Sequence, residues 1–352
     1  MRLKSSLIFS AFTLAASVFG LPGISHAHRA FGGQVCSLGT ADVGQPATLI
    51  CKDILTGSTT QSIPVGPTVS AAGGIGGSLA RGEGRVLVTN QAGGALLFKE
   101  ASGLLKAPQK LETNGEGSLS GALSANGAYV LTGTLLRFFP NGQTWASSSQ
   151  QLLRGDGSAA QVTLTRRFAY VSEKSGSLEA FALGRDGNLA GPATPVSGIA
   201  AGTIVGITGS KDLVVAPIAH LASNFSQATI PVASALRQVQ LVATKETAAC
   251  WAANEDGEAC ITNPGSMTVS CGRLGDDGFE SYTSAAASPV GESAFDLDLR
   301  DGLVGLQAVH QGVPVLLTYS RSEHSDFLTF VSEVPLGTAK AAGALLLPPL
   351  AR

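Results

Sequence analysis

The sequence predicts an all-β fold built from repeated four-stranded units, and two observations carry this prediction. The composition is the first, because 44 glycines and only 14% charged residues suit many short strands joined by tight turns. A recurring motif is the second: a short apolar or β-branched run that ends in a turn. The motif occurs six times, as "LVTN", "YVLT", "YVSE", "LVVA", "CITN" and "QAVH". These segments end at Asn90, Thr132, Glu173, Ala216, Asn263 and His310. Subtraction gives successive spacings of 42, 41, 43, 47 and 47 residues, so the motif marks a structural repeat.

The segments around each hit supply the other strands of one unit. An apolar run such as "AQVTL" (160–164) precedes the hit, and an alternating run such as "GSLEAFAL" (176–183) follows it. A weaker fourth strand lies in stretches such as "GRDGNLAGPATPV" (184–196). A four-stranded repeat of about 44 residues is typical of a β-propeller blade, which buries both faces only by packing against its neighbours around an axis.

The two ends of the chain predict how the ring closes. Near the start, "GGQVCSLG" (32–39), "ATLICKDIL" (47–55) and "TQSIPVG" (60–66) form a blade that lacks its first strand. Near the end, one spare apolar run remains, "AGALLLPP" (342–349). We therefore expect an all-β, seven-bladed β-propeller in which the C-terminal strand closes the N-terminal blade.

The first 27 residues predict export. Arg2 and Lys4 form a basic start, Leu7–Phe19 is apolar, and small residues precede a cleavage point after Ala27. The mature chain, residues 28–352, is then a single propeller domain that is secreted or periplasmic. No transmembrane anchor is expected, because no other apolar stretch reaches the ~20 residues that a spanning helix needs.

The cysteines are read as bridges rather than metal ligands, because export permits oxidation, and of the five only Cys250 is left alone. Cys36 and Cys51 fall on the second and third strands of their blade, and Cys260 and Cys271 do the same in theirs. Facing residues of antiparallel strands lie close enough for a bridge, which predicts Cys36–Cys51 and Cys260–Cys271. A bridge between Cys250 and Cys260 stays open as the alternative.

Charge and motif content limit the partners. The chain holds 23 Lys and Arg against 25 Asp and Glu, with a net charge of −2 and no basic stripe, so nucleic acid is not an expected partner. Neither metal-ligand spacing nor a nucleotide motif is found, and no metal or cofactor is expected. Short, protected sheet edges favour a monomer.

Propeller topology predicts where a ligand would bind. The second strands end, and the first strands begin, on the same face beside the central channel. Polar side chains that converge at such a mouth are the default binding site. The candidates are Asn90, Gln161, Glu173, Asn263, Asp296 and His310. The weak candidates for catalysis are Glu173, Asp296 and His310, with His220 from a loop on the same face; each also has a structural explanation, such as a turn partner.

Three long stretches resemble a known family. "AQVTLTRRFAYVSEKSGSLEAFALGRDGNLAGP" (160–192), "TAACWAANEDGEACITNPGSMTVSCGRLGDDG" (247–278) and "FDLDLRDGLVGLQAVHQGVPVLLTYS" (295–320) resemble the secreted, YVTN-repeat, lactonase-like seven-bladed propellers. This family is related to 6-phosphogluconolactonase and to the muconate-lactonizing propellers. The resemblance covers most of the mature chain, but the Pro-Asp-Gly usual in the first turn is reduced to "EDG" or "ANG". It implies a propeller fold and, as one option, a lactonase activity carried by a histidine, an arginine and a glutamate.

The residues favour binding over catalysis. Opening a lactone needs a general acid or base and a cationic or N–H group for the developing oxyanion. Glu173 is a suitable carboxylate, but the arginines fall at the turns between first and second strands, on the opposite face; these are Arg81, Arg166, Arg167 and Arg300. We therefore expect an exported ligand- or protein-binding or scaffold module whose partner is a small molecule, a glycan or a protein. The alternative is a lactonase-like hydrolase.

Overall fold

The computed structural model describes most of a compact unit that spans Gly32–Arg352. Within 32–351, the residues left out are 41–45, 67–78, 91–93, 115, 142–143, 200–201, 212, 220–225, 232–239, 244–245, 247, 276–277, 287–293 and 323–324. The proposed signal peptide (1–27) and His220 therefore lie outside the described residues. The described residues form β-strands and no α-helix.

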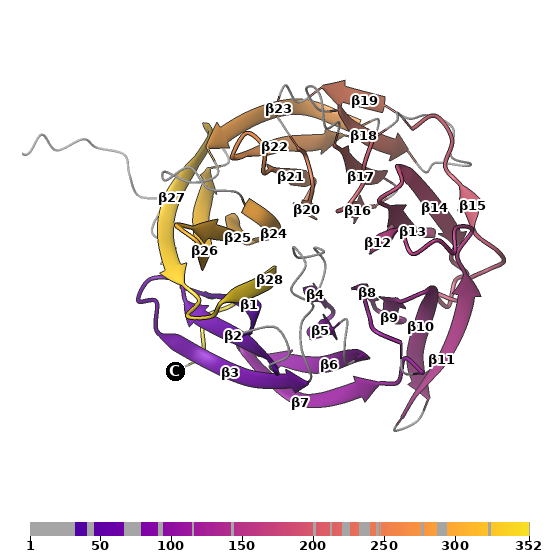
Figure 1. Ribbon diagram of the computed structural model, residues 1–352, viewed down its shortest axis with the longest axis horizontal. Coiled ribbons are helices and arrows are strands. Elements are labelled where there is room, and N and C mark those ends of the chain that lie inside the picture. The colour runs from indigo at the N-terminus through magenta and orange to yellow at the C-terminus, as the bar shows by residue number, and fades with distance from the viewer. Residues whose placement is uncertain are drawn as a thin grey trace, which may run out of the picture. The chain divides into compact units, whose positions relative to one another are not determined.

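The strands form a ring of four-stranded antiparallel sheets, seven of which are found in the described residues (Figure 1). The first strand of each sheet lies nearest the centre of the ring, and the other strands follow outward. Packing of repeated sheets around an axis is a propeller, which confirms the predicted all-β propeller fold.

The strand bounds follow sheet by sheet. The sheet that joins the two ends holds β28 (Lys340–Leu347), β1 (Gln34–Thr40), β2 (Ala47–Asp53) and β3 (Thr59–Gly66). Next along the chain come β4 (Leu79–Gly82), β5 (Arg85–Asn90), β6 (Gly94–Ala101) and β7 (Leu104–Leu111), then β8 (Ser120–Ser124), β9 (Gly127–Leu131), β10 (Thr134–Asn141) and β11 (Thr144–Gln151). The fourth sheet holds β12 (Ala159–Leu164), β13 (Phe168–Glu173), β14 (Ser177–Ala182) and β15 (Thr194–Pro195), and the fifth β16 (Thr208–Ser210), β17 (Leu213–Ile218), β18 (Ser226–Pro231) and β19 (Gln240–Ala243). The last two hold β20 (Ala252–Glu255), β21 (Glu258–Asn263), β22 (Thr268–Gly275) and β23 (Gly278–Ala286), and β24 (Ala294–Arg300), β25 (Leu303–His310), β26 (Val313–Ser322) and β27 (Ser325–Pro335).

Buried side chains between neighbouring sheets form the core. Tyr129, Phe138 and Phe181 are almost completely buried, and burying a large apolar side chain contributes about 1.5–3 kcal/mol. Polar side chains also cross between sheets: the Tyr129 hydroxyl donates to the carbonyl of Gly187 at 2.6 Å. The Arg137 guanidinium donates to the carbonyl of Asp186 in the same loop. These contacts attach the loop after β14 to the preceding sheet.

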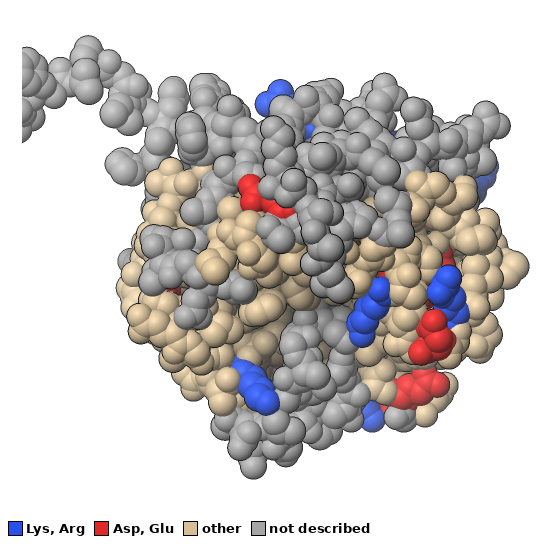
Figure 2. Space-filling model, turned by 45° about the horizontal axis from the view of Figure 1, so that its top comes forward, with Lys and Arg blue, Asp and Glu red and all other residues tan. Residues whose placement is uncertain are grey.

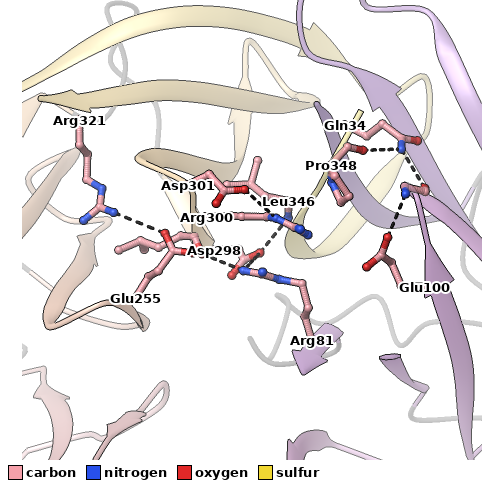
Figure 3. A network of polar contacts seen from close by, with 12 residues as sticks. Gln34, Arg81, Glu100, Glu255, Asp298, Arg300, Asp301, Arg321, Leu346 and Pro348 are labelled. Atoms are coloured by element: carbon pink, nitrogen blue, oxygen red, sulfur yellow. Dashed lines mark hydrogen bonds and ion pairs between the residues drawn. The ribbon is translucent and has the colours of Figure 1, made fainter. Parts of the chain in front are cut away.

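The C-terminal strand closes the ring where the sequence predicted a completing strand. β28 pairs antiparallel with β1, from Gln34 opposite Leu347 to Thr40 opposite Lys340. All three leucines at the end of β28 are buried. The buried side chain of Gln34 donates to the carbonyls of Pro348 at 3.0 Å and of Gly103 at 2.9 Å (Figure 3). One amide group thus joins both ends of the chain to the β6–β7 turn of the next sheet.

Gly103 offers a test of this junction. Its φ is +79°, and an added Cβ would lie 2.5 Å from the Pro348 carbonyl oxygen and 2.7 Å from Gln34 Nε2. Gly312 is a matched control, because its φ is +78° and nothing lies within 4 Å of its Cβ position. The left-handed conformation alone costs an alanine about 1–2 kcal/mol, and overpacking adds about 1–3 kcal/mol. We expect Gly103→Ala to lower the free energy of unfolding by more than Gly312→Ala does, as measured by urea denaturation. Equal losses would mean that the junction does not hold the ring closed.

Two disulfides join facing cysteines on neighbouring strands. Cys36 on β1 lies opposite Cys51 on β2, and Cys260 on β21 lies opposite Cys271 on β22. Both pairs are bridged, which confirms the predicted pairing over the Cys250–Cys260 alternative. Cys250 is a free thiol just before β20, and burial raises its pKa to about 11.

The thiol chemistry should follow from this arrangement. The bridges close loops with sequence separations of 15 and 11 residues, so removing either one by paired Cys→Ala substitution should lower the free energy of unfolding by about 3 kcal/mol.

At pH 8 the Cys250 thiol stays protonated, and alkylation of the native protein should be slow. Peptide mapping without reduction, with mass spectrometry of the alkylated protein, checks both points. Rapid labelling of several cysteines in the native protein would contradict them.

Candidate functional site

The predicted binding residues lie at the strand ends that the repeat assigned to them. Asn90, Glu173, Asn263 and His310 are the last residues of β5, β13, β21 and β25, the second strands of their sheets. Asn90, Glu173 and Asn263 are buried, and His310 is half-buried. These side chains are therefore less exposed to solvent than we expect for residues that line an open binding site.

Several of these side chains make contacts that stabilise the blades. The Asn263 amide donates to Thr268 Oγ1 at 3.0 Å and to Ser270 Oγ at 2.7 Å, which ties β21 to β22. Gln161 Oε1 accepts a hydrogen bond from the Ile207 N–H at 2.6 Å and so joins two neighbouring sheets.

Asp296 and Asn90 also have backbone contacts nearby. Asp296 Oδ1 accepts the Leu297 N–H at 2.8 Å, where the register of β24 against β25 shifts. The backbone N–H of Asn90 donates to Ser118 Oγ at 2.9 Å. Both residues thus take part in hydrogen bonds with the backbone or a serine at the end of a strand.

His310 has a carboxylate partner on its own sheet. Its Nδ1 lies 2.6 Å from Glu333 Oε1, which comes from β27. Glu173 belongs to β13, in another sheet, and bonds to a serine there. The histidine and the glutamate that a lactonase would combine therefore belong to separate polar groups, and His220 lies outside the described residues.

Glu173 is the predicted residue with the most unusual surroundings. Its side chain is fully buried, and Oε2 accepts a hydrogen bond from Ser158 Oγ at 2.5 Å, while Oε1 has no hydrogen-bond partner in the described structure. Burial raises the pKa of Glu173 to about 7, helped by the carboxylates of Glu179 and Asp156 and opposed by the Ser158 hydrogen bond. A carboxyl group that titrates near neutral pH can exchange protons with a ligand.

The raised pKa of Glu173 predicts a pH-dependent stability. The folded protein binds this proton more tightly than the unfolded chain, so the stabilisation is complete below pH 4.5 and is lost as the pH rises to about 7. The loss from this one group is up to about 3 kcal/mol. Glu173→Gln removes this titration. The free energy of unfolding of the variant, measured by urea denaturation, should therefore rise relative to that of the parent as the pH increases from 4.5 to 8. Glu112→Gln, at an exposed carboxylate paired with Lys110, should show no such trend; an equal trend in both variants would refute the assignment.

A second polar site involves the inner strands and was not predicted from the sequence. Three of its residues, Arg81, Glu255 and Asp298, lie on inner strands, and with Arg321 of β26 we call them the inner-strand charge cluster (Figure 3). Arg81 on β4 lies 3.7 Å from Asp298 on β24, and its Nη2 donates to the Leu299 carbonyl at 2.9 Å. Asp298 Oδ2 also accepts the Leu346 N–H of β28 at 2.8 Å. This carboxylate therefore bridges the inner strands of three neighbouring sheets.

The other half of the inner-strand charge cluster joins β20 to β26. Arg321 Nη2 lies 3.6 Å from Glu255 Oε2, and Arg321 also pairs with Glu258. Burial raises the pKa of both Glu255 and Asp298, and the nearby guanidinium groups oppose that rise. These partly buried carboxylates and guanidiniums pair across sheet boundaries and so join neighbouring blades.

The sequence located part of this cluster. Arg81 and Arg300 were placed at turns between first and second strands, away from the mouth, and Arg300 ends β24 beside Asp301, 3.1 Å away. The acidic partners of Arg81 and Arg321, Asp298 and Glu255, were missed because they lie on other blades. An acidic residue within an otherwise apolar inner strand, such as Asp298 in "FDLDLR", was the signal available.

The described residues limit other kinds of site. In this part of the chain, no group of three or more His, Cys, Asp or Glu side chains is arranged to hold a metal ion. Within the same residues, no helix is long and apolar enough to cross a membrane. On the face in Figure 2, the described charged side chains are few, and those on the right of the view place basic beside acidic groups, so no patch of a single sign is seen there.

Comparison with solved structures shows a shared fold at low sequence identity. A protein from Lactobacillus plantarum is 14% identical with a TM-score of 0.59, and the match covers 90% of this chain and 99% of that one. A protein described as a 6-phosphogluconolactonase from Bacteroides fragilis is 11% identical with a TM-score of 0.57, covering 90% and 98%. Apo AztD from Citrobacter koseri is 9% identical with a TM-score of 0.54, covering 91% and 100%. Neither a protein-family model nor a curated protein matches the sequence. The chain is therefore similar in fold to β-propellers that include a lactonase-like protein.

Proposed function

We propose that this protein is an exported β-propeller that acts as a ligand- or protein-binding or scaffold module. Each four-stranded sheet is counted as one blade, which makes seven blades. The partner is a small molecule, a glycan or a protein held at the mouth near the second-strand ends. One observation carries the preference for binding: the described catalytic candidates are engaged separately, His310 with Glu333 and Glu173 with Ser158.

Export rests on the basic and apolar start of the chain and fits the two disulfides. We expect the mature protein to begin at His28, within a residue or two. N-terminal sequencing of protein recovered from the periplasm or the medium checks this, and an intact Met1 in that fraction would contradict it.

A lactonase-like hydrolase is the second candidate, and the raised pKa of Glu173 favours it. A buried carboxyl group with a pKa of about 7 suits a general acid or base at neutral pH. Arg154 lies close enough to lower that pKa, so a cation is also near this carboxylate. The similarity in fold to a propeller described as a 6-phosphogluconolactonase supports this candidate weakly, because one fold hosts many activities.

One comparison separates the two functions. Purified mature protein and its Glu173→Gln variant are assayed for opening of γ- and δ-lactones by pH-stat titration, with Glu112→Gln as the control variant. The binding function predicts no turnover above the buffer rate in any of the three proteins. Turnover that Glu173→Gln abolishes and Glu112→Gln retains would establish the hydrolase instead.

The binding function has its own measurement. A panel of glycans and small metabolites is screened by the thermal shift of the mature protein, because a ligand present at 100 times its Kd adds about 2.7 kcal/mol to stability. A ligand of the mouth should lose its shift in His310→Gln and keep it in Glu112→Gln. A shift that survives every mouth substitution would place the ligand elsewhere.

A further inference from the structure

A pocket separate from the mouth lies where the β4–β7 sheet meets the β8–β11 sheet. Its volume is about 400 Å³, a size suited to a small ligand. The wall includes Glu83 in the β4–β5 turn, a turn between first and second strands, so the pocket opens at the opposite end of the blades from the second-strand ends. The side chains used below are Glu83, Arg85, Leu97, Lys99, Gln109 and Trp145.

A row of cations follows one side of the β4–β7 sheet at this pocket. Arg85 on β5 lies opposite Lys99 on β6, and Lys99 lies opposite Lys106 on β7. Directly opposite residues project from the same face, and like charges in these positions repel each other. Lys99 and Lys106 are exposed, and within the described residues no ion pair to an acidic side chain is found for any of the three. An anion bound across the row would relieve this repulsion.

The neighbouring sheet supplies a flat aromatic surface. Trp145 on β11 is half-buried and packs against the core shared by the two sheets. The Arg85 guanidinium lies 5.6 Å from the centre of the Trp145 ring and donates to the Ser124 carbonyl at 2.9 Å. The aromatic ring and the guanidinium therefore hold each other in place beside the pocket.

The backbone of the pocket wall is also unusual. Ala107 lines the pocket with a φ of +49°, and the register of β7 against β6 shifts beside it, between Leu97 and Lys99. β-bulges and left-handed non-glycine residues are enriched next to binding sites, where they redirect side chains. The bulge thus adds a third, independent feature to the charge row and the tryptophan.

We propose that this pocket binds an acidic oligosaccharide whose uronic acid carboxylate lies between Arg85 and Lys99. One sugar ring packs its apolar face against Trp145, above a floor that includes the buried Leu97 of the same core cluster. Gln109 and Glu83 supply hydrogen-bonding groups for the sugar hydroxyls. An acidic glycan fits better than an acidic peptide, because the pocket combines cations with an aromatic face and uncharged or acidic hydroxyl-binding groups.

Binding is measured with tetragalacturonate against neutral maltotetraose, by isothermal titration calorimetry on the mature protein. Tryptophan fluorescence gives a second readout, since the chain has two tryptophans and Trp251 is 6% exposed, so a saccharide should perturb Trp145. We expect saturable binding of tetragalacturonate that weakens as salt is added, and much weaker binding of maltotetraose.

Variants test the residues. Lys99→Gln and Arg85→Gln should each weaken tetragalacturonate binding about tenfold, as expected for a lost charge-assisted contact. Trp145→Phe should weaken it while Lys99→Arg retains it. Lys110→Gln is the control, because Lys110 lies on β7 outside the pocket and pairs with Glu112 at 3.0 Å. Thermal melts identify any variant that fails to fold.

Three outcomes would overturn the proposal: absence of tetragalacturonate binding, equal binding of maltotetraose, or unchanged binding in Lys99→Gln. Tetraglutamate binding as tightly as tetragalacturonate would assign the pocket to acidic peptides instead. None of these results depends on the mouth, so the proposed function is tested separately.

Discussion

The pairing of β28 with β1 is the contact on which the rest of the structure depends. A four-stranded sheet has two apolar faces, and each sheet of this ring buries them only against its neighbours. An open ring would expose the faces of the first and last sheets to water. The β28–β1 pairing places residues far apart in the chain in one sheet, so that this sheet packs between the first and last of the other sheets.

Polar contacts extend this closure to the neighbouring sheets. Gln34 joins Pro348 to the β6–β7 turn, and Asp298 joins Leu346 to Arg81 (Figure 3). Both groups act across neighbouring sheets and both contact the last part of the chain. The inner-strand charge cluster is consistent with a structural role for the same reason, because losing one partner would leave a buried charge without compensation.

The sequence predicted what depends on neighbours along the chain. Alternating runs, Pro-Gly and Asp-Gly turns and even spacing were sufficient for the strands, the propeller and the completing C-terminal strand. The disulfides followed because each pair of cysteines lies on adjacent strands of one hairpin, where the turn sets the register. These are local relations, and they require no knowledge of how blades face one another.

Contacts between blades could not be predicted in this way. Arg81 and Asp298 are 217 residues apart by subtraction, and Trp145 meets Arg85 across a sheet boundary. The repeat placed Asn263 and Gln161 at the correct strand ends, but it could not show that their side chains bond to neighbouring strands and sheets. Burial at those ends depends on the rotation of each sheet against the next, which periodicity does not encode. The places of these residues on their strands were therefore predicted, and the burial of their side chains was not.

Native-state hydrogen exchange tests the central claim most directly. If β28 closes the ring, the amides of residues 342–347 should exchange only by global unfolding, with the same opening free energy as the amides of β1. Mass spectrometry or NMR of the intact protein, across a series of low denaturant concentrations, measures both values. Exchange of residues 342–347 at the rate of a fraying terminus, while β1 stays protected, would contradict the account.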